Sequence, residues 1–265
     1  MLPTKIKDMD LVRAAAWAPA LRAKADPETE PEAAAQEEDI LGVMDVRFSP
    51  FDRWYEIDDW FEGRFLERTV KGSFAKTIKD NGAQGFRVQF DHGYDPQIGS
   101  KVLGIPESVK EEADSATGVV PLLDTTYNRD LLPGLRRGAY GSSFRFRVIK
   151  DEWNDEPERS DQNPDGIPER TIKEVRLMEF GPVTWPANPD ATAGMRSATA
   201  QFMEKIRSQN PDYVRRFMER VEMVRSTADT PLGAVKVGTS EPRHALPGRR
   251  EMDLRTLELT SLGIL

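Results

Sequence analysis

The sequence contains no cysteine and only two histidines, His92 and His244, in 265 residues. The absence of cysteine excludes a disulfide framework, a thiolate zinc site and a cysteine nucleophile. Any reaction that needs an imidazole group must use one of the two histidines. Long apolar runs are also missing: no stretch approaches the roughly 18 apolar residues of a membrane-spanning helix, and Arg13 and Arg22 interrupt the apolar N-terminal segment, unlike a secretory signal. We therefore expect a soluble protein that is not secreted.

Basic side chains are outnumbered by acidic ones, 37 to 45, which gives a formal net charge of -8. Proteins that coat nucleic acid use a net basic surface or a basic patch, so nucleic acid is not an expected partner. The acidic excess is concentrated in residues 25–39, which have seven acidic side chains, no basic one and no large apolar one. Such a segment buries too little apolar surface to offset the entropy of ordering it. We predict that it is a flexible linker.

The chain length suits one sizeable domain with appendages. We expect the domain over residues 40–195, because apolar and polar positions begin to alternate at its start. Residues 1–39 are expected to be flexible and acidic, apart from a short helix over 9–25. After the domain, the apolar positions of 196–225 fit an extension of two amphipathic helices, and 226–265, rich in Pro, Gly, Thr and Arg, is expected to be a disordered tail.

Short strands dominate the predicted domain. Alternating apolar and polar positions indicate strands over 40–48, 64–70, 86–90, 101–110, 118–124, 142–150 and 170–178. Helices are expected at 74–82 and 127–138, and residues 151–170, with eight acidic side chains and three prolines, are expected to form a long exposed loop. This pattern predicts an α+β fold, a mainly antiparallel, β-barrel-like domain with helices around it.

A histidine and two serines are the first candidates for catalysis. His92 ends the apolar face of the strand at 86–90 and is followed by Gly93, so its imidazole can be partly desolvated and still reach a cleft. A core histidine without a function gives the same pattern. As a general base, the histidine needs a nucleophile, and the hydroxyls of Ser142 and Ser143 follow small residues that let backbone N–H groups approach a substrate carbonyl. The alternative is that these serines merely begin a strand.

A carboxylate that can orient the histidine follows later in the chain. In a regular strand, Val175, Leu177 and Glu179 share one face, which places the carboxylate of Glu179 on the apolar side. A buried carboxylate is costly unless it is paired, and an imidazolium is one partner that satisfies it. An exposed Glu at a strand end is the alternative. His244 lies in a segment with no visible fold, so we do not expect it to act in catalysis.

Four sequence blocks add information about the protein family through their order and their residues. The blocks are GSFAKTIKD, FDHGYDPQIGS, LRRGAYGSSFRF and VRLMEFGPVTWPANPDA. With these blocks, residues 40–195 resemble the capsid maturation (prohead) proteases of tailed phages and prophages, a family of serine endopeptidases related to herpesvirus assemblin. The resemblance implies an assemblin-like architecture and serine protease activity.

The resemblance also implies roles for individual residues. His92 matches the family's histidine in its D-H pair, Ser143 matches the nucleophilic serine, and Glu179 matches the acidic residue of the L-x-E block. The chain departs from the commoner Ser-Ile-Gly-Phe wording by having Arg145 in place of the glycine. This departure leaves Ser142 as an alternative nucleophile.

Two further features of the implied site stay open. Asp91 is the alternative to Glu179 as third member of the triad. Backbone N–H groups near the nucleophile would hold the oxyanion, aided by an arginine for which the candidates are Arg136, Arg137 and Arg145.

The implied reaction is acyl transfer, which requires no metal and no organic cofactor. The implied substrates are the major capsid protein, the scaffold segment and the protease itself, and we expect self-association within the procapsid. The expected location is the host cytoplasm and the procapsid interior, with neither nucleic acid nor a membrane as a partner.

Two other functions are compatible with the sequence. A non-catalytic capsid assembly or scaffold protein built on the same domain would account for the acidic linker, the amphipathic stretch at 198–224 and the departure at Arg145. A calcium site in residues 151–170 is the weaker alternative, because that loop lacks the regular ligand spacing of an EF-hand.

Overall fold

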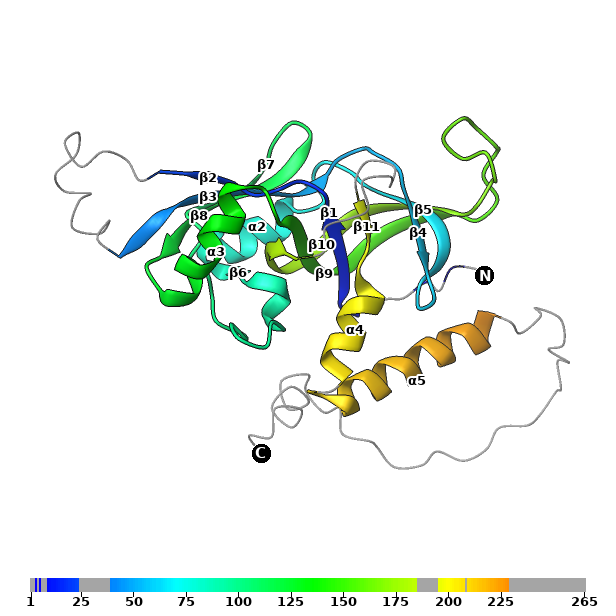
Figure 1. Ribbon diagram of the computed structural model, residues 1–265. Helices are drawn as coiled ribbons and strands as arrows, with labels where there is room; N and C mark the ends of the chain where they lie inside the picture. The colour runs from blue at the N-terminus through cyan, green and yellow to red at the C-terminus, as the bar shows by residue number, and fades with distance from the viewer. Residues whose placement is uncertain are drawn as a thin grey trace, which may run out of the picture. The chain divides into compact units, whose positions relative to one another are not determined.

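The computed structural model describes residues 3, 5, 9–23, 39–184, 195–207 and 209–228, which form two β-sheets and four α-helices (Figure 1). The larger sheet has seven strands in the order β11-β1-β9-β10-β5-β4, with β6 also paired to β10. Its strands are β1 (Leu11–Ala15), β4 (Tyr55–Asp59), β5 (Gly63–Thr69), β6 (Arg87–Val88), β9 (Gly141–Asn154), β10 (Glu169–Val183) and β11 (Met195–Ser197). The smaller sheet, in the order β2-β3-β8-β7, consists of β2 (Ala20–Arg22), β3 (Ile40–Pro50), β7 (Ser108–Glu111) and β8 (Ser115–Leu123).

The helices connect or follow these strands. The α-helices are α2 (Ala75–Asn81), α3 (Thr126–Arg136), α4 (Thr199–Arg207) and α5 (Pro211–Ala228), and the short 3-10 helices are η1 (Ala83–Gly85) and η2 (Phe90–Gly93). No described helix combines the length and the apolar character needed to cross a membrane.

The fold is α+β as predicted, but the prediction of a barrel is wrong. Neither sheet of described strands closes, because the end strands β11 and β4 of the larger sheet do not pair with each other. Strand β10 pairs in parallel with β5 and β6 and antiparallel with β9, so the larger sheet is mixed. Alternation along a strand shows which side chains share a face and does not show which strands pair. The sequence pattern therefore cannot distinguish an open sheet from a closed one.

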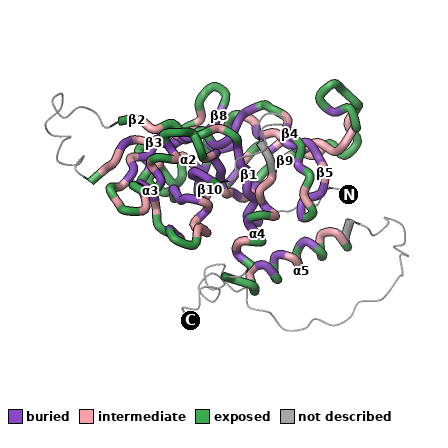
Figure 2. The backbone as a smooth tube through the Cα atoms, viewed as in Figure 1, coloured by how far each residue is buried: buried purple, intermediate pink, exposed green. Residues whose placement is uncertain are grey.

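Phenylalanine rings from both sheets form the centre of the main core. The backbone of buried residues is purple in Figure 2. The ring of Phe48 on β3 stacks on that of Phe180 on β10, with centroids 4.8 Å apart, and lies 5.6 Å from that of Phe144 on β9. This close approach needs Gly118 of β8, because a Cβ at that position would lie 2.4 Å from the ring of Phe180. Full burial of each ring contributes about 1.5–3 kcal/mol, which holds the two sheets together.

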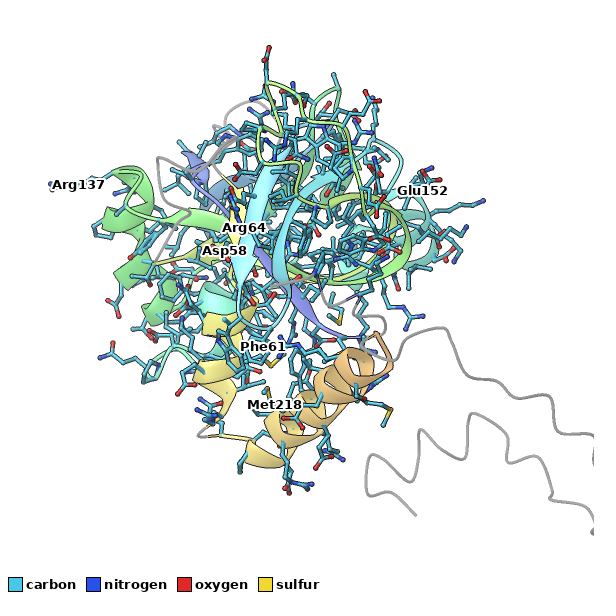
Figure 3. All side chains as sticks on the ribbon, turned by 90° about the vertical axis from the view of Figure 1, so that its right-hand side faces the viewer. Asp58, Phe61, Arg64, Arg137, Glu152 and Met218 are labelled. Carbon is cyan, nitrogen blue, oxygen red and sulfur yellow. The ribbon has the colours of Figure 1, made fainter. Side chains whose placement is uncertain are left out.

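A second apolar cluster, separate from the main core, joins α4 and α5 to the larger sheet. On the sheet side it contains Met9, Val12 and Phe61. Phe61 lies in the turn between β4 and β5, beside the helix that carries Met218 (Figure 3), and its ring stands edge-on to that of Phe217 at 5.1 Å. The two C-terminal helices therefore pack against the second cluster and not against the main core.

Most elements predicted from the sequence are present. The predicted strands starting at 40, 64, 118, 142 and 170 correspond to β3, β5, β8, β9 and β10, the predicted helices at 74–82 and 127–138 correspond to α2 and α3, and the two predicted C-terminal helices are α4 and α5. The strand predicted over 86–90 is reduced to β6 followed by η2, and the loop at 151–170 is shorter than predicted because β9 and β10 extend into it and pair at Asn154 and Glu169.

The helix predicted over residues 9–25 is wrong, because these residues contain β1 and β2. Every residue of β1 is buried, and the strand pairs with β9 on one edge and β11 on the other. These tertiary contacts outweigh the helix propensity of its alanines. Strands of both sheets thus begin before residue 40. Most of the predicted linker and tail, residues 24–38 and 229–265, lies outside the described residues.

Candidate active site

His92 sits in a strained turn that follows the short strand β6. Asp91 and His92 have φ values of 50° and 59°, and Gly93 follows with 79°, so three successive residues adopt the left-handed region. Such a conformation costs of order 1–3 kcal/mol for each residue other than glycine and persists only where the surroundings impose it. The side chain of Gln89 donates to the carbonyl of Ser100 at 2.8 Å and fixes the start of the turn. The turn aims the imidazole at β9 and β10.

A glycine in β10 allows this turn to lie close to the sheet. A Cβ at Gly181 would lie 2.1 Å from the carbonyl oxygen of Gln89, a backbone atom. In the β9–β10 register, Gly181 lies directly opposite Ser143. The absence of a side chain at position 181 therefore brings the segment that carries His92 within reach of the serine.

Ser143 lies near the start of β9 and is fully buried. Its Oγ is 2.8 Å from Nε2 of His92 and 2.9 Å from the main-chain oxygen of Arg13 on β1. A hydroxyl has one hydrogen to donate, so these two acceptors compete for it. Ser142 points to the other face of the strand and donates to the main-chain oxygen of Trp17 at 2.5 Å. Of the two candidate serines, only Ser143 contacts the histidine.

Glu179 reaches the histidine from the neighbouring strand. Its Oε2 lies 2.7 Å from Nδ1 of His92, and its side chain is fully buried. The expectation that Glu179 shares a face with Leu177 is wrong, because the β9–β10 register shifts between these two residues. The resulting β-bulge turns Glu179 away from the core and places it opposite Arg145, on the face that carries Ser143. Bulges that re-aim a side chain in this way are common beside active sites.

The other candidates lie elsewhere. Asp91 forms an ion pair with Lys205 of α4 instead of contacting the imidazole ring. Arg136 and Arg137 are exposed at the end of α3, and Figure 3 shows Arg137 at the edge of the molecule. Arg145 lies beside the site, with its guanidinium carbon 5.5 Å from the ring centre of a phenylalanine on α4. His244 lies outside the described residues.

A buried charge network supports the strand that contacts Ser143. The guanidinium of Arg13 binds the carboxylates of Glu62 and Glu67 at 2.7 Å each, and Nη1 of Arg170 binds Glu67 at 3.2 Å. Burial alone would lower the pKa of Arg13, but the two carboxylates raise it well above its ordinary value. Burial alone would likewise raise the pKa of Glu67, but the two arginines lower it below 4.5. The network therefore stays charged and holds β1 in place.

This network was not predicted from the sequence. The signal for it was a charged residue inside an apolar strand, Arg13 in the run LVRAA, together with carboxylates at Glu62 and Glu67 beside apolar positions. A buried arginine needs carboxylate partners, but nothing in the sequence says which ones are near.

Helix α4 covers the site. The space beside Ser143 is a cavity of about 30 Å³, which holds about one or two water molecules. Its lining consists of Ala14, Asp91, His92, Ser143, Val183, Ala198, Gln201, Phe202 and Lys205.

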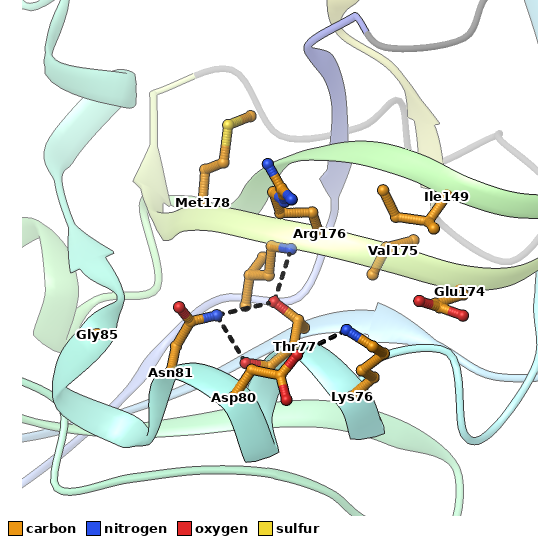
Figure 4. A pocket seen from close by; sticks show the side chains of 11 residues that line it. Lys76, Thr77, Asp80, Asn81, Gly85, Ile149, Glu174, Val175, Arg176 and Met178 are labelled. Atoms are coloured by element: carbon orange, nitrogen blue, oxygen red, sulfur yellow. Dashed lines mark hydrogen bonds and ion pairs between the residues drawn. The ribbon is translucent and has the colours of Figure 1, made fainter. Parts of the chain in front are cut away.

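A larger hollow of about 500 Å³ lies between α2 and β10 (Figure 4). Thr77 and Asn81 are hydrogen-bonded to each other there, and Lys76 is paired with Asp80 at 2.7 Å. Its lining contains no histidine, so it lacks a base of the kind found beside Ser143. Among the described residues, no three His, Asp or Glu side chains are grouped so that they could hold a metal ion.

Comparison with protein families assigns the chain to a family. The sequence profile described as caudovirus prohead serine protease matches residues 31–206, more than half of the chain. The chain belongs to the caudovirus prohead serine protease family. The matched region includes all four sequence blocks that resemble prohead proteases, so that resemblance is confirmed. It also includes His92, Ser143 and Glu179.

Individual proteins give few matches to this family member. No curated protein matches the chain significantly. Among solved structures, the chain is similar to the bacteriophage T4 capsid assembly protease, gp21, with a TM-score of 0.40 and 12% sequence identity. That match covers 67% of this chain and 99% of the T4 chain.

Proposed function

We propose that this chain is a serine endopeptidase that processes capsid and scaffold proteins, and itself, during maturation of a phage procapsid. The proposal is carried by the contacts of 2.8 Å from Ser143 Oγ to His92 Nε2 and 2.7 Å from His92 Nδ1 to Glu179 Oε2. Hydrogen-bond reach between a nucleophile, a base and an orienting acid is what acyl transfer by serine requires. Membership of the prohead serine protease family supports the same reaction.

In the proposed reaction, Oγ of Ser143 attacks a peptide carbonyl carbon while Nε2 of His92 accepts the hydroxyl proton. Glu179 accepts the hydrogen of Nδ1, which leaves Nε2 free as the acceptor and stabilises the imidazolium that forms. The imidazolium gives its proton to the leaving amine as the C–N bond breaks. A water molecule then attacks the acyl-enzyme with the same base, which releases the second product and restores the serine.

The oxyanion of the tetrahedral intermediate needs hydrogen-bond donors. We assign this role to backbone N–H groups near Ser143, aided by Arg145. Arg145 lies two residues further along β9 and opposite Glu179. The exposed positions of Arg136 and Arg137 argue against a role for either of them.

The proposed substrates are the major capsid protein and the scaffold segment, inside the procapsid. The test is to co-express the chain with the capsid protein and to follow processing of the shell protein and of the chain itself. We expect Ser143→Ala and His92→Ala to abolish both, while Ser142→Ala, the matched control for a serine hydroxyl in the same strand, retains them. Processing that continues in Ser143→Ala would refute the proposal.

A non-catalytic role in capsid assembly is the competing function. The full burial of Ser143 favours it, because a covered serine does not attack a substrate. The same experiment separates the two functions. If the chain is an assembly protein, the wild type and the Ser143→Ala variant support shell formation equally well, and neither cleaves the capsid protein.

A further inference from the structure

Helix α4 lies over the residues to which we assign catalysis, and we infer that it is an intramolecular blocker that occupies the peptide-binding cleft. A peptide substrate then reaches Ser143 only when α4 leaves its place on the sheet. This inference rests on the proposed function, and it adds how the same site is controlled.

The space around the serine is too small for a substrate. Reaction requires the carbonyl carbon to come within about 3–3.5 Å of Oγ, but Ser143 is 0% exposed and the cavity beside it measures about 30 Å³. The ring of Phe202 on α4 stands edge-on to the imidazole of His92, with centres 5.9 Å apart, and to the ring of Tyr94 at 5.3 Å. A peptide must therefore displace Phe202 before it can lie against the histidine.

Polar contacts fasten α4 at both ends. At the start, the hydroxyl of Ser197 lies within hydrogen-bond distance of carboxylate oxygens of Asp59 and Glu62, at 2.9 and 2.8 Å. At the end, Lys205 forms its ion pair with Asp91, the residue next to the catalytic histidine in the strained turn. The second contact ties the position of α4 directly to the turn that aims the imidazole.

The way α4 is attached allows it to leave without unfolding the domain. Its buried apolar residues, Phe202, Met203 and Ile206, belong to the second apolar cluster, which is separate from the main core between the two sheets. Among the described residues outside α4 and α5, that cluster includes only Met9, Val12 and Phe61 as buried residues. Undocking of α4 would expose this small cluster and leave the phenylalanine core intact.

The polar groups of the site are not fully satisfied while α4 is in place. Oε1 of Glu179 and Nε of Arg145 are buried, and neither has a hydrogen-bond partner among the described residues. Buried polar atoms in folded proteins nearly always have partners, and each exception calls for an explanation. If α4 covers the site only until the substrate arrives, α4 has no need to supply hydrogen-bond partners for these atoms.

The test measures how fast a fluorophosphonate probe modifies Ser143 in the full-length chain. Lys205→Glu places a carboxylate against Asp91, and Phe202→Ala removes the ring beside His92. We expect each to raise the labelling rate at least about tenfold, since truncation of a buried Phe weakens its docking by more than that factor. Arg207→Glu, which makes the same charge change at an exposed position of α4, is the matched control and should label at the wild-type rate.

One outcome would overturn the inference: both variants, each shown to be folded by its thermal transition, label no faster than the wild type, while processing in procapsids still depends on Ser143. Failure of the proposed function looks different, because shell processing would then continue in Ser143→Ala or be absent from the wild type as well.

Discussion

Replacement of Gly181 by alanine should separate the geometry of the active site from the stability of the fold. The added Cβ would lie 2.1 Å from the main-chain oxygen of Gln89, whereas an ordinary C···O contact is about 3.3 Å. The segment from Gln89 to His92 must therefore move away from β10 by about 1 Å. A misplacement of that size at a reacting group costs roughly 10²-fold in rate, while crowding of this kind costs about 1–3 kcal/mol of stability.

The assay is the initial rate of capsid-protein processing, with the thermal transition of each variant measured alongside. Gly104→Ala is the matched control, because its Cβ would lie 2.0 Å from the main-chain oxygen of Pro121, in a bridge to the smaller sheet. We expect both variants to lose stability and only Gly181→Ala to lose about two orders of magnitude in rate. Equal rates for the two variants would refute the argument that Gly181 positions His92.

The remaining predictions concern two carboxylates. Glu179→Gln should lower the rate of processing by roughly 10³–10⁴-fold with little loss of stability, because an amide no longer holds His92 in the tautomer that accepts the serine proton; a loss below about tenfold would contradict this role. Glu67→Gln should cost about 3–5 kcal/mol of unfolding free energy at pH 7, because it leaves buried Arg13 and Arg170 without their shared partner. Burial alone would raise the pKa of Glu67 but the two arginines lower it below 4.5, so its charge stabilises the fold above that pH and the contribution is lost as the pH falls through the lowered pKa. Thermal melts should therefore show the difference between wild type and Glu67→Gln shrinking in acid, and a difference that stays constant from pH 7 to pH 3 would contradict the account.

The residues of the candidate site could be chosen from the sequence, but their arrangement could not. The resemblance to prohead proteases and the pattern of a regular strand both point to Glu179, but a regular strand would place its side chain in the core. The register shift after Leu177 turns it to the opposite face, and a bulge leaves no reliable mark in a single sequence. The choice between Ser142 and Ser143 depended on the same unknown, because strand neighbours point to opposite faces and the direction of the first is set by tertiary packing.

The fold was predictable where local pattern decides and unpredictable where pairing decides. The amphipathic repeat of α5 and the alternation of β9 reflect burial of one face, and both were recognised. Strand β1 is buried on both faces and has no alternation to recognise. The charge network around Arg13 joins residues that are 49 and 54 positions apart, so its partners appear only in the folded chain.

Identification of the residue that reacts with a serine-directed probe tests the central claim most directly. The chain is co-expressed with the major capsid protein, and a fluorophosphonate is added while processing takes place. We predict a single modified peptide, labelled at Ser143, whose label disappears in His92→Ala and persists in Ser142→Ala. Processing that goes on with Ser143 unmodified at saturating probe, or labelling of Ser143 that is as fast without His92, would contradict it.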